Sequence, residues 1–162
     1  MSIGVCFVSS YPPRHCGMAT YTESIIRRMS VPQNSIFIVA ISDKKDAYQY
    51  GSNVIAEIVQ DDRESYLQAA RSINQHPGIK VVNIQHVFSL FGGKHGENIV
   101  FFINELKKPV VTTLHMVYER DLAPHRLEVV ERSYSEITEE LIKKSIRIVV
   151  MIQPMADVLQ EQ

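Results

Sequence analysis

Histidines and glycines gather in three polar segments of this sequence, and each segment follows an apolar run rich in Val and Ile. The first segment contains His15 and Gly17, the second contains His86, and the third begins at His115. A neutral imidazole can hydrogen-bond or exchange a proton near neutral pH. A helix that begins at a glycine can present its first amides to an anion. These residue types therefore favour a site that binds and orients a polar or phosphorylated ligand.

The segment "RHCGMAT" leaves two interpretations of Gly17 open. It is either a turn that faces a phosphate or a tight strand-to-helix turn that needs glycine for backbone reasons. The segment matches neither the Walker pattern nor the G-x-G-x-x-G dinucleotide pattern. Cys16 lies beside it, but a nucleophile also needs a base and an orienting group, and His15 alone is thin support. We therefore expect Cys16 to be incidental.

The segment "FGGKHG" places Gly92, Gly93 and Gly96 around Lys94 and His95. Loops of this kind at a ligand-binding edge often close on substrate. We therefore expect a mobile substrate loop, and a plain flexible connection is the alternative.

His86 and His115 each follow an apolar run directly. A lone histidine at a strand end is often a structural group, but two at equivalent strand ends favour a functional role. Basic side chains near the same segments would suit an anionic group of a substrate. They are Arg14, Lys94, Arg120 and Arg126.

Six short apolar runs alternate with helical patterns along the chain. Most are nearly continuous in Val and Ile, which is typical of parallel strands buried on both faces. The runs cover 3–8, 36–41, 54–59, 80–84, 109–114 and 146–152. This alternation predicts an α/β fold, a Rossmann-like doubly wound parallel sheet of about six strands. Ligands bind such sheets outside the carboxyl ends of the strands, so the polar segments should meet in one crevice.

The helical patterns between the runs also carry predicted caps. Apolar residues recur at helical spacing over 18–29, 66–73, 99–106 and 127–141, and Pro154 opens a last short helix. Thr20 and Glu23 have the spacing of a capping box, and we expect the helix to start just after Gly17. Asp61 with Glu64 predicts the cap of the second helix.

Composition narrows the class of protein. The 162 residues are 45% apolar and 22% charged with a net charge of −1, which suits one globular domain over 1–162 and gives no basic excess for nucleic acid. We find neither a secretory signal nor an apolar run near the ~20 residues that a membrane span requires. Two cysteines form no disulfide framework, which favours the cytoplasm, and no ligand pair has zinc-site spacing, so no metal is expected.

Three segments together resemble the N-terminal half of the group 1 retaining GT-B glycosyltransferases. They are "FVSSYPPRHCGMATYT", "VVNIQHVFSLFGGKHG" and "PVVTTLHMVYER", and their order and spacing match across nearly the whole chain. More narrowly, they resemble a bacterial and archaeal subgroup with "PPRxCGIAT" and "IQHEFGIFGG" types of segment. The chain departs from this subgroup at Val87, where an acid is usual, so no acid role is expected there.

The resemblance implies two Rossmann-like domains that face a cleft, the first for the acceptor and the second for the nucleotide-sugar. Gly17 and Met18 would approach the donor diphosphate, and Arg14 would contact phosphate or acceptor. His115 would contact the donor sugar near the reaction centre. His86 and the loop with Gly92, Gly93, Lys94 and His95 would line the acceptor side.

The implied reaction moves a hexosyl group from a nucleotide-diphosphate sugar to a sugar or lipid-linked acceptor, with retention of configuration and no metal or cofactor. Because the chain ends at Gln162, we expect the nucleotide-sugar domain to be absent from it. The chain alone should then be inactive, and two copies could pair through the exposed cleft. A cytoplasmic location is expected, with peripheral membrane attachment left open. The alternative is a flavodoxin-like module that binds a sugar, a phosphate ligand or a partner protein without catalysis; a dinucleotide oxidoreductase is disfavoured by the missing glycine pattern.

Overall fold

The computed structural model describes residues 3–118 and 128–160, with the backbone alone described over 128–133. Its six strands form one parallel sheet in the order β3-β2-β1-β4-β5-β6. They are β1 (Gly4–Ser9), β2 (Ile36–Ser42), β3 (Val54–Val59), β4 (Ile79–His86), β5 (Val110–Leu114) and β6 (Arg147–Val150). The predicted α/β class and all six predicted strands are confirmed.

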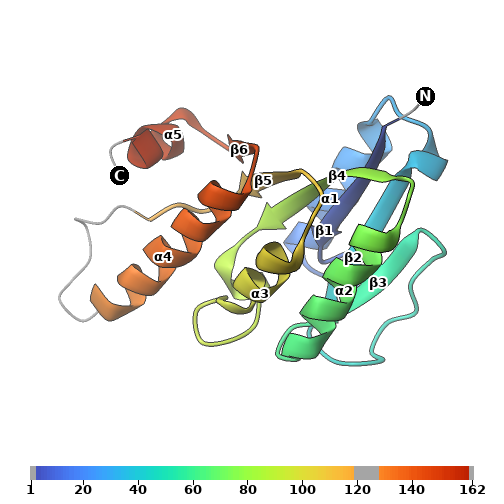
Figure 1. Cartoon of the computed structure of the whole chain (residues 1–162), viewed down its shortest axis with the longest axis horizontal. Coiled ribbons are helices and arrows are strands. Elements are labelled where there is room, and N and C mark those ends of the chain that lie inside the picture. The colour runs from blue at the N-terminus through green and yellow to red at the C-terminus, as the bar shows by residue number, and fades with distance from the viewer. Residues whose placement is uncertain (1–2, 119–127, 161–162) are drawn as a thin grey trace.

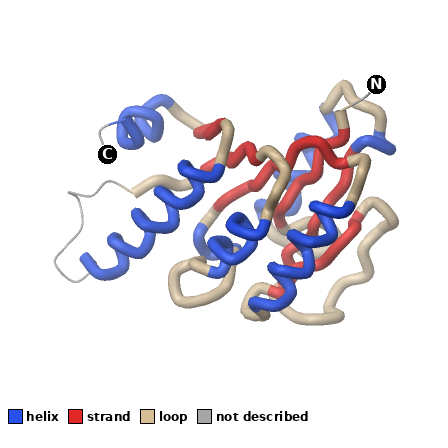
Figure 2. Tube along the Cα trace, viewed as in Figure 1, coloured by secondary structure: helices blue, strands red, loops and turns tan. Residues whose placement is uncertain are grey.

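Helices cover both faces of the sheet, which is the doubly wound, Rossmann-like arrangement. In Figure 1, α2, α3 and α4 lie in front of the sheet and α1 lies behind it. Figure 2 shows the strands as one layer between them. The helices are α1 (Gly17–Arg28), α2 (Arg63–Gln75), α3 (Asn98–Glu105), α4 (Glu128–Lys144) and α5 (Gln153–Gln160), with short 3-10 turns at Gln33–Ser35 and Phe88–Leu90. Leu127, the first apolar residue of the predicted fourth helix, lies outside the described residues.

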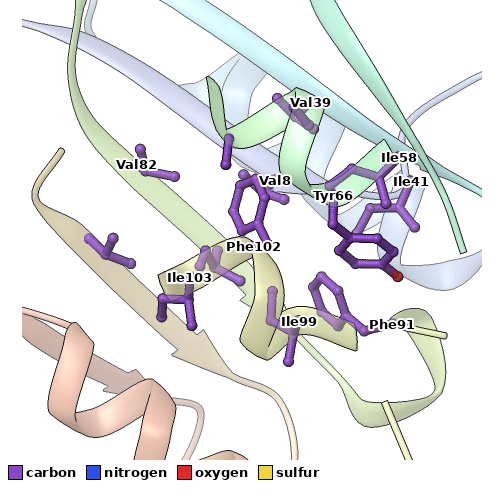
Figure 3. Close-up of a cluster of buried hydrophobic side chains, with 14 of the residues drawn as sticks. Val8, Val39, Ile41, Ile58, Tyr66, Val82, Phe91, Ile99, Phe102 and Ile103 are labelled. Carbon is purple, nitrogen blue, oxygen red and sulfur yellow. The ribbon is translucent and has the colours of Figure 1, made fainter. Parts of the chain in front are cut away.

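Two apolar clusters explain why the strands are nearly continuous in Val and Ile. Successive strand residues point to opposite faces, and here both faces are covered. The larger cluster fills the space between the sheet and α2, α3 and α4, and it includes Val82 of β4 together with Phe102 and Ile103 of α3 (Figure 3). The smaller cluster packs Phe7 and Ile38 against Ile26 of α1. Burial of each large side chain stabilises the fold by ~1.5–3 kcal/mol.

The start of α1 lies within one residue of the prediction, but its cap differs. The helix begins at Gly17 with Cys16 as its N-cap, and no side chain caps it. Thr20 lies inside the first turn, where its hydroxyl donates to the carbonyl of Cys16 at 3.4 Å, and Glu23 pairs with Arg27 at 2.8 Å. The predicted capping box is therefore wrong, because the helix starts three residues before the residue that would have capped it.

The cap of α2 is displaced by one residue from the prediction. Asp62 is the N-cap, and its carboxylate accepts a hydrogen bond from the amide of Glu64 at 3.1 Å. Asp61, the predicted cap, instead accepts the amide of Gly93 at 3.0 Å. The prediction for Asp61 is wrong because two adjacent acids have different partners, one local and one from a distant loop.

The centre of the sheet positions the candidate site. From β1 the chain crosses to β2 on one side, and from β4 it crosses to β5 on the other, so the strand order reverses between β1 and β4. A crevice forms at the carboxyl ends of the strands at such a switch point. Among the described residues, no helix combines the length and the apolar character needed to cross a membrane.

Candidate functional site

His115 follows β5 and is held by an amide of the neighbouring strand. Its Nε2 atom lies 2.7 Å from Oε1 of Gln85 on β4. The other end of the Gln85 amide, Nε2, donates to Oδ1 of Asn83 and to the hydroxyl of Thr113 at 3.4 Å. Because Oε1 can only accept, His115 carries its hydrogen on Nε2 and leaves Nδ1 as an acceptor.

The surroundings of His115 favour the neutral ring. The side chain is half-buried, and this burial lowers its pKa below the ordinary value. The ring of Tyr21 meets it edge-on, with centroids 4.8 Å apart and planes at 89°. A neutral, oriented imidazole with a free lone pair can accept a hydrogen bond from a substrate hydroxyl at pH 7.

Helix α1 contacts His115 through the ring of Tyr21, which stands one turn from the start of that helix. The turn has no side-chain cap and no acidic residue, so the amides at Gly17 and Met18 keep their positive field. A Cβ at Gly17 would meet nothing within 4 Å, and its φ lies outside the left-handed region. Neither packing nor backbone conformation requires this glycine. That observation favours the phosphate-facing interpretation over the tight turn.

Arg14 has protein partners at the carboxyl ends of β2 and β3. Its Nη1 donates to the carbonyl of Ile41 at 2.8 Å, and its Nη2 donates to Oε1 of Gln60 at 3.3 Å. These contacts tie the loop after β1 to the neighbouring strands. The predicted contact to phosphate or acceptor stays a prediction, and Arg120 and Arg126 lie outside the described residues.

His86 ends β4 and points into the opposite face of the sheet from Gln85. It is fully buried, stacked on Phe91 at 5.3 Å and edge-on to Phe88 at 4.7 Å. Burial, and then the proximity of His115, lower its pKa to about 3. Neither ring nitrogen has a hydrogen-bond partner among the described residues. The structure gives His86 a packing role, and its predicted contact with substrate stays a prediction.

The glycine-rich loop is hydrogen-bonded to the core at its start. The phenol of Tyr66 donates to the carbonyl of Gln60 at 2.8 Å and accepts the amide of Gly92 at 3.0 Å. Tyr66 is buried against the large cluster, close to Phe91 (Figure 3). A Cβ at Gly92 would lie 1.8 Å from the carbonyl oxygen of Gln60, so this position admits only glycine without a backbone shift.

The rest of the loop is held by carboxylates. The amides of Lys94 and His95 donate to Glu97 at 3.1 and 2.8 Å. Burial raises the pKa of Glu97, but these amide hydrogen bonds outweigh it and leave the pKa below its ordinary value. Gly93 and Gly96 have φ values of +90° and +86°. The backbone conformation therefore explains why these positions are glycine. Closure of the loop on a substrate stays a prediction.

A pocket of about 310 Å³ opens between this loop and α4. Gly92, Gly93, Lys94 and His95 line it, whereas His86 does not, and their role as an acceptor wall stays a prediction. It also contains aromatic residues that the sequence analysis did not single out as site residues: Phe88, Phe91, Tyr118 and Tyr134. Met116, which follows His115 directly, lines the pocket as well, so the histidine and the pocket adjoin. The missed signal was the presence of aromatic residues inside polar segments that follow strands.

Comparison with protein-family models finds no match for the chain, and comparison with curated proteins finds none either. The fold alone does not define a function, because doubly wound sheets host many chemistries. The chemistry of the crevice must therefore carry the functional argument.

Proposed function

We propose that this chain is the acceptor-side domain of a retaining glycosyltransferase that uses a nucleotide-diphosphate sugar as donor. One observation carries the proposal: Tyr21, one turn into the uncapped helix α1, packs edge-on against a neutral, oriented His115 at the carboxyl end of the sheet. A helix start suited to a diphosphate and an imidazole suited to sugar hydroxyls thus belong to two elements in contact. The resemblance of three sequence segments to the GT-B glycosyltransferases supports the same assignment.

The proposed roles follow from where charge develops. As the glycosyl bond breaks, negative charge grows on the departing diphosphate. The amides at Gly17 and Met18 would donate hydrogen bonds to it, and preorganised donors of this kind stabilise a transition state strongly. Nδ1 of His115 would accept a hydrogen bond from the donor sugar and hold the reacting carbon in position.

The acceptor would approach from the pocket next to Met116, opposite the start of α1. The nucleotide would be held by a second domain, as the resemblance implies. The amides that begin α1 would meet the diphosphate charge, and the resemblance implies a reaction without a metal. A cytoplasmic location of the protein is part of the proposal, because it suits a nucleotide-sugar donor.

The test uses the protein expressed from its complete reading frame. A panel of nucleotide-diphosphate sugars is supplied, and release of nucleotide and the anomeric configuration of the product are followed by NMR. His115→Ala should lower kcat at least ~100-fold, which corresponds to about 2.7 kcal/mol of transition-state stabilisation. His76→Gln is the matched control, because His76 precedes β4 at the opposite edge of the sheet. Unchanged turnover in His115→Ala, or no release of nucleotide from any donor, would overturn the proposal; ligand binding without turnover would favour a binding module.

A further inference from the structure

The hydrogen bond between His115 and Gln85 fixes one atom of the imidazole ring but determines the plane of the ring only weakly. Nε2 of His115, which lies 2.7 Å from Oε1 of Gln85, is at the tip of the ring, close to the axis about which the ring turns. The torsion that turns a histidine ring has broad minima. A second contact is therefore needed to fix the direction in which Nδ1 points.

The ring of Tyr21 supplies a second contact to His115. The two ring centroids are 4.8 Å apart, and the two planes meet at 89°. Edge-to-face pairs of this kind are a preferred arrangement of aromatic rings. A turn of the imidazole about its axis would change the angle between the planes and disturb the contact. Tyr21 thus resists rotation of the His115 ring.

Tyr21 is itself held at both ends. The next residue of α1, Thr22, donates a hydrogen bond from its hydroxyl to the hydroxyl of Ser9 at 2.8 Å, and both of these side chains are fully buried. This bond fastens α1 to the end of β1 beside Tyr21. At the far end, the Tyr21 hydroxyl donates to Sδ of Met151, which follows β6, at 3.7 Å. A thioether is a weak acceptor, so packing is the main part of this contact.

We propose that Tyr21 is the positioning residue of His115: it fixes the plane of the imidazole ring and so the direction of Nδ1. The side chain of Tyr21 reaches from α1 to the residue after β5 and to the residue after β6. The orientation of the ring is a property of the folded chain. Its use in glycosyl transfer rests on the proposed function, in which Nδ1 accepts a hydrogen bond from the donor sugar.

The first test follows the His115 ring in the 162-residue chain by NMR. Through-space contacts of the ring hydrogens report the plane of the ring, and a pH titration reports its pKa. Tyr21→Ala removes the aromatic contact, so the contacts of the His115 ring should become averaged over several orientations. Because burial lowers the pKa of His115 in the native protein, the added exposure should raise that pKa toward its ordinary value. Tyr21→Phe keeps the ring and should leave both properties as they are.

Two further variants complete this test. Met151→Ala withdraws the packing support of the phenol, so it should change the His115 ring in the same direction as Tyr21→Ala, by less. Tyr48→Ala is the matched control and should leave His115 unchanged, because Tyr48 bonds Asp43 after β2, three strands from β5. Urea unfolding of each variant separates a loss of stability from a loss of orientation.

The transfer assay of the proposed function gives the second readout. Tyr21→Ala should lower kcat at least ~10-fold, because a reacting group misplaced by about 1 Å can cost ~100-fold in rate. KM for the donor should stay within a few-fold, because the residue positions His115 and does not itself bind the donor. Tyr21→Phe should restore kcat to within a few-fold of the native value.

The remaining outcomes are decisive. Unchanged ring contacts and an unchanged pKa of His115 in folded Tyr21→Ala overturn the proposal, and so does a Tyr21→Phe variant that behaves like Tyr21→Ala. An unchanged kcat of Tyr21→Ala, in a protein that transfers sugar, overturns the role of Tyr21 in the reaction. Loss of ring orientation in Tyr21→Ala, in a protein that transfers no sugar from any donor, would instead overturn the proposed function and leave the assignment of Tyr21 standing.

Discussion

The Nε2 atom of His115 lies 2.7 Å from Oε1 of Gln85, and that amide is fixed in turn by Asn83. The partner of the histidine is therefore a neutral group, not a carboxylate. A carboxylate would favour the imidazolium ion, whereas an amide oxygen fixes the tautomer and leaves the ring neutral. This arrangement suits a group that accepts a hydrogen bond from substrate.

Gln85→Glu should convert this site to the charged form. A carboxylate beside His115 stabilises the imidazolium ion, so the pKa of His115 should rise, against the lowering that burial causes in the native protein. Nδ1 would then carry a proton and could not accept. In the transfer assay of the proposed function, turnover at neutral pH should fall at least ~10-fold.

The measurement is an NMR titration of the His115 ring in both proteins, together with the pH profile of kcat. Gln75→Glu, an exposed residue at the end of α2, is the control for added negative charge. A pKa of His115 that stays in place, or moves down, in Gln85→Glu would contradict the assigned hydrogen bond.

Gly17→Ala should separate binding from stability. A methyl group at Gly17 meets nothing within 4 Å, so the free energy of unfolding should stay the same or rise by up to ~1 kcal/mol. The same methyl would stand in front of the first amides of α1. In the transfer assay of the proposed function, KM for the donor should therefore rise at least ~10-fold, measured by steady-state kinetics.

Gly96→Ala is the contrasting variant. Its φ is +86° and a Cβ there would lie 2.4 Å from the carbonyl oxygen of Phe88, so the fold should lose ~1–3 kcal/mol in urea unfolding. An unaltered donor KM in Gly17→Ala would show that the start of α1 is only a helix terminus. Loss of fold in Gly17→Ala would contradict the open space described there.

His86 should make the fold sensitive to acid. Its pKa in the folded protein is about 3, well below the 6.5 of a free histidine, so the unfolded chain binds the proton more readily. The contribution of neutral His86 is complete above pH 6.5 and is lost as the pH falls from there toward 3. Between pH 7 and pH 5 this one group should lower the free energy of unfolding by about 2 kcal/mol.

His86→Leu should remove most of that pH dependence. Leucine fits among Phe88 and Phe91 and leaves no unpaired ring nitrogen, so stability at pH 7 should change by less than ~1.5 kcal/mol. Urea unfolding at the two pH values measures the difference, with His15→Leu as the exposed control. Part of the acid sensitivity of the fold should persist in every variant, because burial lowers the pKa of His115 too. An equally steep decline in His86→Leu would refute the role given to His86.

The strands and the edge of the site could be predicted from sequence because they depend on local patterns. Runs of Val and Ile mark buried parallel strands, and whatever follows such strands must meet at one edge. The N-cap residues of α1 and α2 could not be predicted from such local patterns. Asp61 and Asp62 are equivalent as sequence signals, and only the approach of Gly93 in space distinguishes them. Thr20 and Glu23 have cap spacing, but the helix starts earlier.

The aromatic pocket escaped prediction for a different physical reason. Helical spacing marks Tyr134 as a residue on the inner face of its helix, which is correct, but spacing does not tell what that face meets. Here it meets Tyr118 and Phe88 around a cavity and not a filled core. Cavities arise between elements that are distant in sequence, so no local pattern encodes them.

The phenol of Tyr66 joins the end of β3 to the loop after β4, since it binds the carbonyl of Gln60 and the amide of Gly92 at once. One core side chain thus hydrogen-bonds both segments that border the crevice here. A large movement of either segment would disturb the packing of Tyr66 in the hydrophobic core. Burial raises the pKa of Tyr66 to about 12, with the Gly92 amide opposing, so this fastening keeps its proton across the physiological range. On this side, the start of the glycine-rich loop is therefore positioned by a residue of the hydrophobic core.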